Sequence, residues 1–486
     1  MPLDTDTDSS IDALAGSPPQ IIQGGMGAGV SDWRLARTVS QDGALGVVSG
    51  TGLDSILAAR LQMGDVDGHI RRAMESFPFP EIAERTWERY YIEGGKSPDQ
   101  KFKNRPTFRL DSSLRLLQQT VLANYVEVWL AKEGHDRPVG INYLEKIQLP
   151  HLPSIYGAML AGVDYVLMGA GIPIQIPAVL DLFSNHEEAV YTLYVENQGN
   201  CEASKVRFDP REVLGVVEAG LKRPDFIAII AYESLAKVMT KKAKGKVNGF
   251  VIEGPTAGGH NAPPREKNLF NERGEPLYGE KDVVDLSKIA SYGLPFWLAG
   301  GKGSPQGRKE ALLAGGAGIQ VGSLFALCDE SGLDPIIKRD ILEMIRNGDV
   351  DVYTDARASP TGFPFKVIQK KGTLSDDAAY AARPRICDLG YLRSLHRTEN
   401  GSTVLRCPSE PQDTYAMKGG QLEDTIGRKC VCNGLMAAIG MGQARSNGYV
   451  ELPILTSGDA INEARRFLRA DKMSYSALDV LAYLRG

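Results

Sequence analysis

The chain has 486 residues, of which 43% are hydrophobic and 24% are charged, and its formal net charge is −5. This length allows a large buried core, and the mild acidity argues against nucleic acid or an anionic membrane surface as a main partner. No apolar run reaches the roughly 20 residues that a membrane-spanning helix needs. Six cysteines do not make the disulfide framework of a small secreted protein, so we expect a cytoplasmic protein.

Residues 1–18 are acidic and polar, and we expect them to form a flexible leader rather than a signal or transit peptide. After them, short runs rich in Val, Ile and Phe alternate with helical patterns, which is typical of parallel βα units. Continuous apolar strands favour an α/β fold of the (β/α)₈ TIM-barrel type over 19–327, with an open doubly wound sheet as the alternative. The eight candidate strands cover residues 20–25, 44–50, 138–142, 164–169, 226–231, 249–254, 295–301 and 317–323.

Three segments interrupt or extend this repeat. The stretch of about 66–136 is far longer than an ordinary connection, and we interpret it as an inserted subdomain that forms a lid or a subunit contact. The pattern around 189–208 predicts an additional hairpin. Residues 328–486 follow the barrel as a C-terminal extension that holds a group of cysteines and ends in a helix.

Small residues end the last two predicted strands. Barrel enzymes often bind a phosphate group between the loops that follow strands seven and eight, on backbone amides and a helix N-terminus. Ser304 and Pro305 supply a clean helix start directly after the first of these loops. A single Gly-Gly pair can be only a tight turn, but two such loops on consecutive strands favour a phosphate site. The candidate residues are Gly300, Gly301, Gln320, Val321, Gly322 and Ser323.

The sixth predicted strand leads into a second glycine-rich segment that ends in a histidine. Gly258 and Gly259 allow the chain to pass close to a flat ligand, and His260 follows them at the barrel face where active sites are built. An imidazole has an ordinary pKa of about 6.5, which suits proton transfer near neutral pH. The other five histidines are interpreted as surface or core residues. Asn142, at the end of the third strand, is either an amide ligand at the same face or a turn residue.

Five motifs in order carry a family resemblance: IIQGGMG (21–27), GIN (140–142), EGPTAGGH (253–260), LAGG (298–301) and IQVGS (319–323). In these motifs the sequence resembles the nitronate monooxygenase (2-nitropropane dioxygenase-like) family of FMN-dependent TIM barrels. That group also includes the flavin-dependent enoyl-thioester reductases. The segment FPFKVIQKKGTL (363–374) is similar to the larger reductases of polyunsaturated fatty-acid synthesis.

The resemblance implies an FMN cofactor and a role for each matching residue. Gly24 and Met26 would lie against the flavin ring, Asn142 would bond to it, and Glu253 and Gly258 would contact the ring or the ribityl chain. Gly300, Gly301, Gly322 and Ser323 would hold the phosphate beside Gln320 and Val321, and His260 would be the catalytic histidine. The family commonly has Gln in place of Glu253, so a negative charge is expected near the flavin here.

Three functions are considered. The first, which the resemblance favours, is oxidation of alkyl nitronates or nitroalkanes by O₂, with His260 orienting the substrate or removing its α-proton. The second is NAD(P)H-dependent reduction of an enoyl thioester, or the reverse dehydrogenation of an acyl thioester. The third is a non-catalytic flavoprotein subunit. The expected partner is a small molecule, an acyl thioester in the second case, and a homo-oligomer is left open.

Four of the six cysteines lie in the extension: Cys387, Cys407, Cys430 and Cys432. Four thiolates can bind a tetrahedral zinc ion or a [4Fe–4S] cluster. Their spacing matches neither the paired zinc pattern nor the ferredoxin pattern. The spacing therefore favours reduced thiols without a ligand, and a zinc ion or an iron–sulfur cluster is kept as the alternative.

Overall fold

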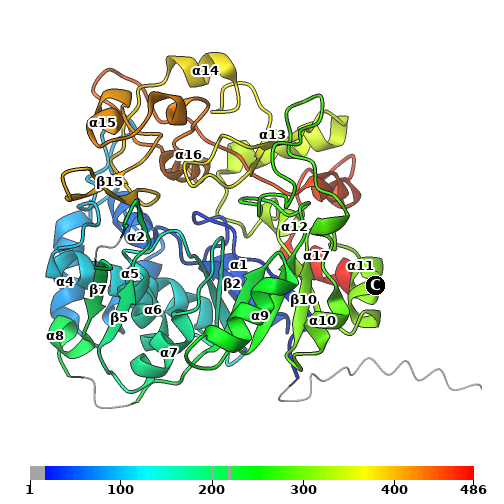
Figure 1. The fold of residues 1–486 in the computed structure, drawn as a ribbon, viewed down its shortest axis with the longest axis horizontal. Helices are drawn as coiled ribbons and strands as arrows, with labels where there is room; N and C mark the ends of the chain where they lie inside the picture. Colours follow the sequence, from blue (N-terminus) through cyan, green and yellow to red (C-terminus); the bar gives the residue numbers. More distant parts are fainter. Residues whose placement is uncertain (1–16, 200–201, 217–219) are drawn as a thin grey trace, which may run out of the picture.

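The structure is a computed structural model that describes residues 17–199, 202–216 and 220–486, so the predicted leader lies almost wholly outside the described residues. Eight parallel strands form the centre of the fold (Figure 1). They are β1 (Ile21–Gln23), β2 (Gly46–Ser49), β3 (Val139–Leu144), β4 (Tyr165–Gly169), β8 (Asp225–Ile230), β9 (Gly249–Glu253), β10 (Phe296–Ala299) and β11 (Gly318–Val321). β1 pairs with β11, and Ile22 bridges to Leu45 beside β2, so the sheet closes on itself. The predicted barrel is confirmed, and the open doubly wound sheet is wrong.

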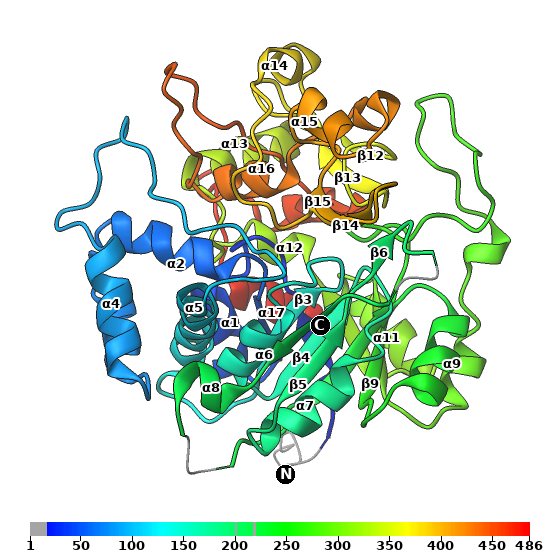
Figure 2. The same ribbon diagram turned by 60° about the vertical axis from the view of Figure 1, so that its left-hand side comes forward.

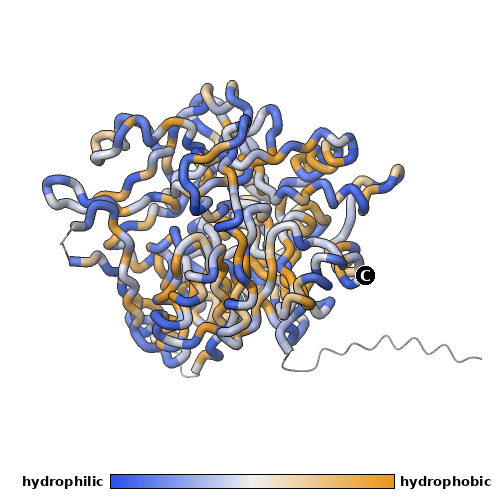
Figure 3. Tube along the Cα trace, turned by 45° about the vertical axis from the view of Figure 1, so that its right-hand side comes forward, coloured by the Kyte–Doolittle hydropathy of each residue, from blue (hydrophilic) through white to orange (hydrophobic). Residues whose placement is uncertain are grey.

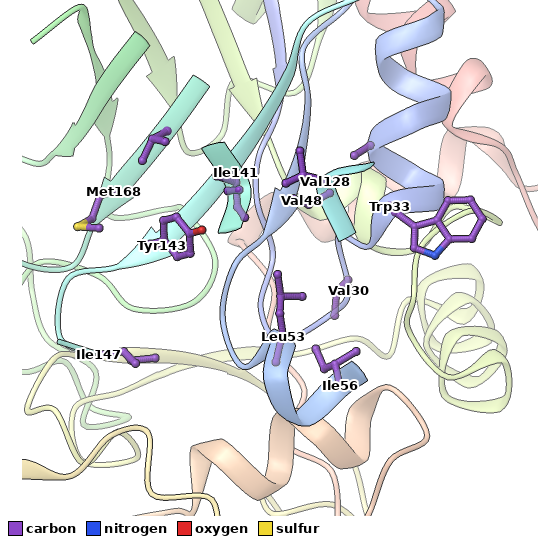
Figure 4. Packing of buried hydrophobic residues seen from close by; sticks show 14 of the residues in the cluster. Val30, Trp33, Val48, Leu53, Ile56, Val128, Ile141, Tyr143, Ile147 and Met168 are labelled. Carbon is purple, nitrogen blue, oxygen red and sulfur yellow. The ribbon is translucent and has the colours of Figure 1, made fainter. Parts of the chain in front are cut away.

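Alternate residues of these strands point into the barrel or toward the helices around it. The side chains that fill the barrel are Ile22, Leu45, Val47, Leu167, Ile227, Val251, Trp297 and Ala299. Val48, Ile141 and Met168 belong to the larger core outside the barrel, where Figure 4 shows them with other buried side chains. Because the interior is filled by side chains, a ligand can bind only at an end of the barrel.

Helices surround the barrel, and the helix start predicted at Ser304 and Pro305 is confirmed. Ser304 caps α11 (Pro305–Leu313), its hydroxyl accepting a hydrogen bond from the Gly307 amide at 3.0 Å, and Pro305 takes the first position. The main surrounding helices are α1 (Trp33–Gln41), α2 (Leu53–Gln62), α5 (Leu114–Lys132), α6 (His151–Leu160), α7 (Ile176–Ser184), α9 (Glu233–Lys242), α10 (Leu286–Ala290), α11 (Pro305–Leu313) and α12 (Ser323–Ala326). None of the helices in the described residues is both long and apolar enough to cross a membrane.

The long segment between β2 and β3 combines two kinds of structure. α3 (His69–Glu75) and α4 (Pro80–Tyr90) lie at the outside of the molecule (Figure 2), and an irregular arm follows them. α5, by contrast, packs against α1, α2 and α6 and takes the place of a regular barrel helix. The unusual length therefore comes from α3, α4 and the arm, which precede the crossover helix.

The predicted hairpin is confirmed as the antiparallel pair β5 (Ala189–Thr192) and β7 (Lys205–Phe208), and α8 (Pro210–Leu214) follows it. Between its strands, β6 (Val195–Glu196) pairs with β14 (Ser394–Arg397) of the extension. This contact ties the barrel to a segment about two hundred residues later, and no local pattern predicts it.

The extension lies across the carboxyl ends of the barrel strands (Figure 1). Its elements are α13 (Pro335–Asn347), β12 (Val352–Asp355), β13 (Phe365–Ile368), α14 (Asp377–Ala382), β14 (Ser394–Arg397), β15 (Thr403–Arg406), α15 (Gln412–Met417), α16 (Val431–Ala438), the 3₁₀ segment η3 (Asp459–Phe467) and α17 (Ala477–Arg485). α17 returns to pack on α1 and α11, beside the barrel. Figure 3 shows apolar segments gathered within the body and polar ones along the outer loops.

Candidate functional site

A cavity of about 280 Å³ lies at the carboxyl ends of the barrel strands and is covered by the extension. The structure brings all the flavin-site residues named from the sequence into its lining. They are Gly24, Met26, Asn142, Glu253, Gly258, His260, Gly300, Gly301, Gln320, Val321, Gly322 and Ser323. Their individual contacts with a cofactor stay predictions.

His260 is held in the cavity wall by the extension. Its Nε2 atom lies 2.6 Å from Ser359 Oγ, and the centroids of its ring and the Phe365 ring are 4.7 Å apart. Burial lowers the pKa of His260 to about 4, so the imidazole is neutral at neutral pH. In the described part of the chain Nδ1 has no hydrogen-bond partner, which leaves this nitrogen for a ligand.

Backbone contacts with the extension fix the segment that carries His260. The Lys366 amide donates to Gly259 O at 3.0 Å, and the Asn261 amide donates to Pro364 O at 2.9 Å. The Gly259 amide donates to Thr456 Oγ1 at 2.9 Å. Sequence reasoning missed Ser359, Phe365 and Thr456, and the only signal near any of them was the resemblance of residues 363–374 to larger reductases.

Two residues that line the cavity have a buried amide oxygen without a hydrogen-bond partner among the described residues. Asn142 Nδ2 donates to Gly25 O at 3.3 Å, but Asn142 Oδ1 and Gln320 Oε1 accept no hydrogen bond from the described residues. Buried acceptors are normally paired, so a ligand with N–H donors fits here. A flavin ring carries such a donor. Asn142 lies within β3, which extends to Leu144, and the alternative interpretation as a turn residue is therefore wrong.

The opposite end of the cavity suits a phosphate group. Gly300 (φ 85°) and Gly301 (φ 66°) are both left-handed, and a Cβ on Gly300 would lie 3.0 Å from Thr256 Oγ1. Ser323 Oγ accepts a hydrogen bond from the Gly458 amide at 2.9 Å, so its own proton is available to a ligand. Lys302 also lines the cavity, and its ammonium pairs with Glu310 at 3.0 Å. These groups fit the phosphate of FMN.

Replacing Gly300 by alanine is expected to weaken FMN binding, because the new Cβ distorts the loop at the phosphate end. The matched control is Gly315→Ala, since Gly315 (φ 82°) has the same backbone conformation and open space around its Cβ position. Both variants should lose about 1–2 kcal/mol of stability from the left-handed backbone. FMN titration followed by fluorescence quenching should show a loss of affinity for Gly300→Ala only, and equal affinities would contradict this role of the loop.

Glu253 ends β9 and lines the cavity, where its side chain is half-buried. Burial raises the pKa of its carboxyl to about 8, and no cation or hydrogen-bond donor in the described residues offsets this effect. The carboxyl is therefore mostly protonated at neutral pH in the protein without a ligand. The negative charge expected near the flavin is therefore wrong for the protein without a ligand. The residue type alone does not reveal that no cation lies beside the Glu253 carboxyl.

The Glu253 carboxyl should make the free energy of unfolding fall as pH rises between about 4.5 and about 8. The unfolded chain releases this proton near pH 4.5, whereas the folded chain keeps it until about pH 8, so rising pH favours unfolding in this window. Urea titrations of the FMN-free protein at several pH values should show a flatter dependence for Glu253→Gln. Glu399→Gln, at an exposed position, serves as the control and should follow the parent.

The four cysteines of the extension lie close together. A hydrogen bond between Cys387 and Cys407 lowers the pKa of the Cys387 thiol and raises the pKa of the Cys407 thiol. Burial raises the pKa of Cys430 to about 12 and also raises that of Cys432. Within residues 17–199, 202–216 and 220–486, no group of three or more His, Cys, Asp or Glu side chains is arranged to hold a metal ion, so the geometry does not support zinc or a cluster.

The fold and the cavity define a (β/α)₈ barrel with a cofactor site that runs from the glycine-rich loops after β10 and β11 to His260 after β9. Residues 193–357 match the family model described as nitronate monooxygenase. The match includes Glu253, His260 and both glycine-rich loops, so the resemblance seen in the motifs is confirmed there. The family implies FMN as the cofactor.

A relative described as "Probable nitronate monooxygenase" from Bacillus subtilis (strain 168) is 34% identical over 93 residues. The aligned part covers 19% of this chain and spans only about a quarter of that relative, 25% of its length.

Solved structures align over most of the chain at low identity. FabK from Thermotoga maritima is 16% identical, with 96% of this chain and 91% of that chain covered and a TM-score of 0.44. Nitroalkane oxidase from Streptomyces ansochromogenes is 14% identical, with 96% and 95% covered and a TM-score of 0.45. The enoyl reductase domain of MlnA from Bacillus amyloliquefaciens is 13% identical, with 97% and 94% covered and a TM-score of 0.44. The assignment of the barrel rests on the strand pairing and does not depend on these alignments.

Proposed function

We propose that the protein is an FMN-dependent oxidoreductase that acts on an acyl-chain substrate, with His260 as the residue that transfers a proton. The reaction that fits is reduction of an enoyl thioester, or the reverse dehydrogenation. The observation that carries this choice is the apolar wall of the cavity, which is formed by side chains other than those assigned to FMN.

The apolar wall comes from both the barrel and the extension. Its members are Leu144, Ile147, Ile229, Leu392, Val431, Leu435 and Met436. Burial of each CH₂ group contributes about 0.8 kcal/mol to the binding of a hydrocarbon chain, so such a wall favours a long substrate. A small alkyl nitronate makes little use of it.

FMN, when bound, supplies the electron-transfer chemistry of the reaction. Gly300, Gly301 and Ser323 would hold its phosphate, and Asn142 and Gln320 would accept hydrogen bonds from its ring. Side chains of the extension, among them Leu392 and Leu435, line the cavity and would limit the access of bulk water to the reacting atoms. Nδ1 of His260 gives a proton to the substrate α-carbon in the reduction and takes it in the dehydrogenation.

Nitronate oxidation is the second candidate, and the family match over 193–357 favours it. A neutral imidazole can accept the α-proton of a nitroalkane or orient a nitronate by a hydrogen bond, so the state of His260 is compatible with this chemistry. The apolar wall has no evident use in this reaction.

The test uses the FMN-loaded protein without oxygen and follows the visible absorption band of the oxidised flavin. We expect NADH or NADPH to bleach the band and a long-chain enoyl thioester to restore it. Bleaching by propionate nitronate alone would overturn the acyl-chain proposal in favour of nitronate oxidation. Failure of every substrate to change the band would favour a non-catalytic flavoprotein.

Leu435→Asn should raise KM for a long-chain enoyl thioester more than for a short-chain one, because only the long chain reaches the apolar wall. Leu478→Asn is the control, since Leu478 is about half exposed on α17. Steady-state kinetics with enoyl thioesters of two chain lengths measure the difference. Equal changes in KM for both chain lengths would exclude this wall as the site of chain binding.

A further inference from the structure

A chain of hydrogen-bonding side chains leads away from His260 on the side opposite the cavity. Ser359 is fully buried, and its Oγ atom lies 2.6 Å from His260 Nε2. The same Oγ atom lies 2.9 Å from Thr361 Oγ1. Thr361 is half-buried and precedes Gly362, which is exposed. The three side chains therefore connect the cavity to the surface of the extension.

The hydroxyl protons of this chain have two consistent arrangements. Ser359 Oγ already accepts a hydrogen bond from the Thr361 amide at 3.2 Å, and its single proton points either to His260 or to Thr361. In the first arrangement His260 carries its proton on Nδ1, and in the second it carries it on Nε2. The heavy atoms occupy the same places in both.

The surroundings of His260 make such a chain necessary for proton transfer. Phe363 and Phe365 lie beside the imidazole, and no carboxylate of the described residues pairs with it. Its pKa is lowered by burial, so the imidazolium form is scarce at neutral pH. A neutral imidazole that gives up the Nδ1 proton would become an imidazolate unless Nε2 receives a proton at the same time.

We propose that His260, Ser359 and Thr361 form a proton relay between solvent water and the substrate. This inference rests on the proposed function only in that His260 exchanges a proton with the substrate. In the reduction, the Nδ1–H bond breaks and a C–H bond forms at the carbanionic α-carbon. Nε2 takes the Ser359 proton, Ser359 takes the Thr361 proton, and Thr361 takes a proton from water, which leaves hydroxide in the solvent.

Charge and protons balance in this sequence, because the negative charge of the carbanion ends on hydroxide and no group keeps an additional proton. The imidazole changes from the Nδ1–H to the Nε2–H form. Water that enters the cavity after product release protonates Nδ1, and the relay returns the Nε2 proton to the surface. In the dehydrogenation the same transfers run in the opposite direction. Ser359 and Thr361 are positioning residues, since neither contacts the cavity.

The kinetic test compares Ser359→Ala and Thr361→Val in the FMN-loaded enzyme. Each should lower kcat about tenfold or more, within the range of lost acid–base assistance, and leave KM and FMN affinity nearly unchanged. Thr361→Ser should restore kcat. The matched control is Thr373→Val, because Thr373 and Ser375 form another hydroxyl pair of the extension, at 2.8 Å and remote from the cavity. An unchanged kcat in Thr361→Val would overturn the relay.

A second measurement does not depend on turnover. ¹⁵N NMR of the FMN-loaded protein, with the His260 signals assigned from a His260→Gln variant, should show the two ring nitrogens in a different tautomer balance after Ser359→Ala. An unchanged balance would overturn the relay, whatever the substrate is. If the tautomer balance changes but the protein turns over no enoyl thioester, the hydrogen bond between Ser359 and His260 is supported. In that case only the proposed function is contradicted. If Ser359→Ala fails to fold, Thr361→Val and Thr361→Ser carry the same test.

Discussion

Replacing His260 by glutamine is expected to lower kcat by about 10²–10⁴-fold while FMN stays bound. A glutamine amide can still hydrogen-bond to Ser359, but it cannot take up and release a proton near neutral pH. His260 is the only histidine among the described residues that line the cavity, so no second imidazole can replace it. The measurement is kcat with the substrate that changes the flavin absorption, together with the FMN content of the purified variant.

His135→Gln is the matched control for this experiment. His135 Nε2 is 2.8 Å from Ala131 O at the end of α5, away from the cavity, and its replacement should leave kcat and FMN content unchanged. If His260→Gln kept full activity, His260 would not be the proton-transferring residue. If neither the parent nor the variant turned over any substrate, the protein would be better described as a non-catalytic flavoprotein subunit.

Replacing Arg105 by methionine is expected to cost about 3–5 kcal/mol of unfolding free energy, because it leaves the Asp54 carboxylate buried without its cation. Arg105 and Asp54 form an ion pair and are only 3% and 2% exposed. The guanidinium also lies 4.4 Å from the centre of the Tyr391 ring, and Nη2 donates to Leu389 O at 3.1 Å. Through these contacts the arm before α5 holds the extension on the barrel.

Urea denaturation of the parent and the variant measures this cost. Arg109→Met is the control, since the side chains of Arg109 and Asp111 are 70% and 77% exposed and such pairs contribute about 0–1 kcal/mol. Adding Asp54→Asn to Arg105→Met should recover part of the loss, because the unpaired charge is then gone. FMN should also dissociate more readily from Arg105→Met, since Tyr391 lines the cavity. Equal costs for the Arg105 and Arg109 variants would contradict the role of this ion pair.

The barrel and the residues of its site could be predicted because local sequence patterns indicate both. Each strand is a short continuous apolar run that ends in small residues, and a closed parallel barrel brings all such ends to one face. Gly24, His260 and Gly322 are far apart in sequence, but the first and last directly follow a strand and His260 lies in the loop after β9, so the fold brings them to one cavity.

Contacts between the barrel and the extension could not be predicted in the same way. Ser359 lies 99 residues after His260, and Thr456 lies 197 residues after Gly259, and no periodicity or motif connects these positions. The role of α5 as a helix of the barrel could not be predicted for another reason. Nearly all of this helix is buried, so its sequence lacks the polar face that identifies a helix on the barrel surface.

The protonation state of Glu253 illustrates a further limit. A glutamate at this position suggests a negative charge, but its pKa depends on what surrounds the carboxyl in three dimensions. The sequence shows that Glu253 stands where the family commonly has Gln. The structure shows that burial without a counter-ion raises the pKa of the Glu253 carboxyl to about 8.

The contacts that close the cavity have a consequence for the order of folding. Thr456 contacts Gly259 and Gly458 contacts Ser323, over sequence separations of 197 and 135 residues. Contacts between residues so far apart form more slowly than the local contacts within a βα unit, because a long loop must close first. We therefore expect the barrel strands to pair before residues 456–458 close the cavity.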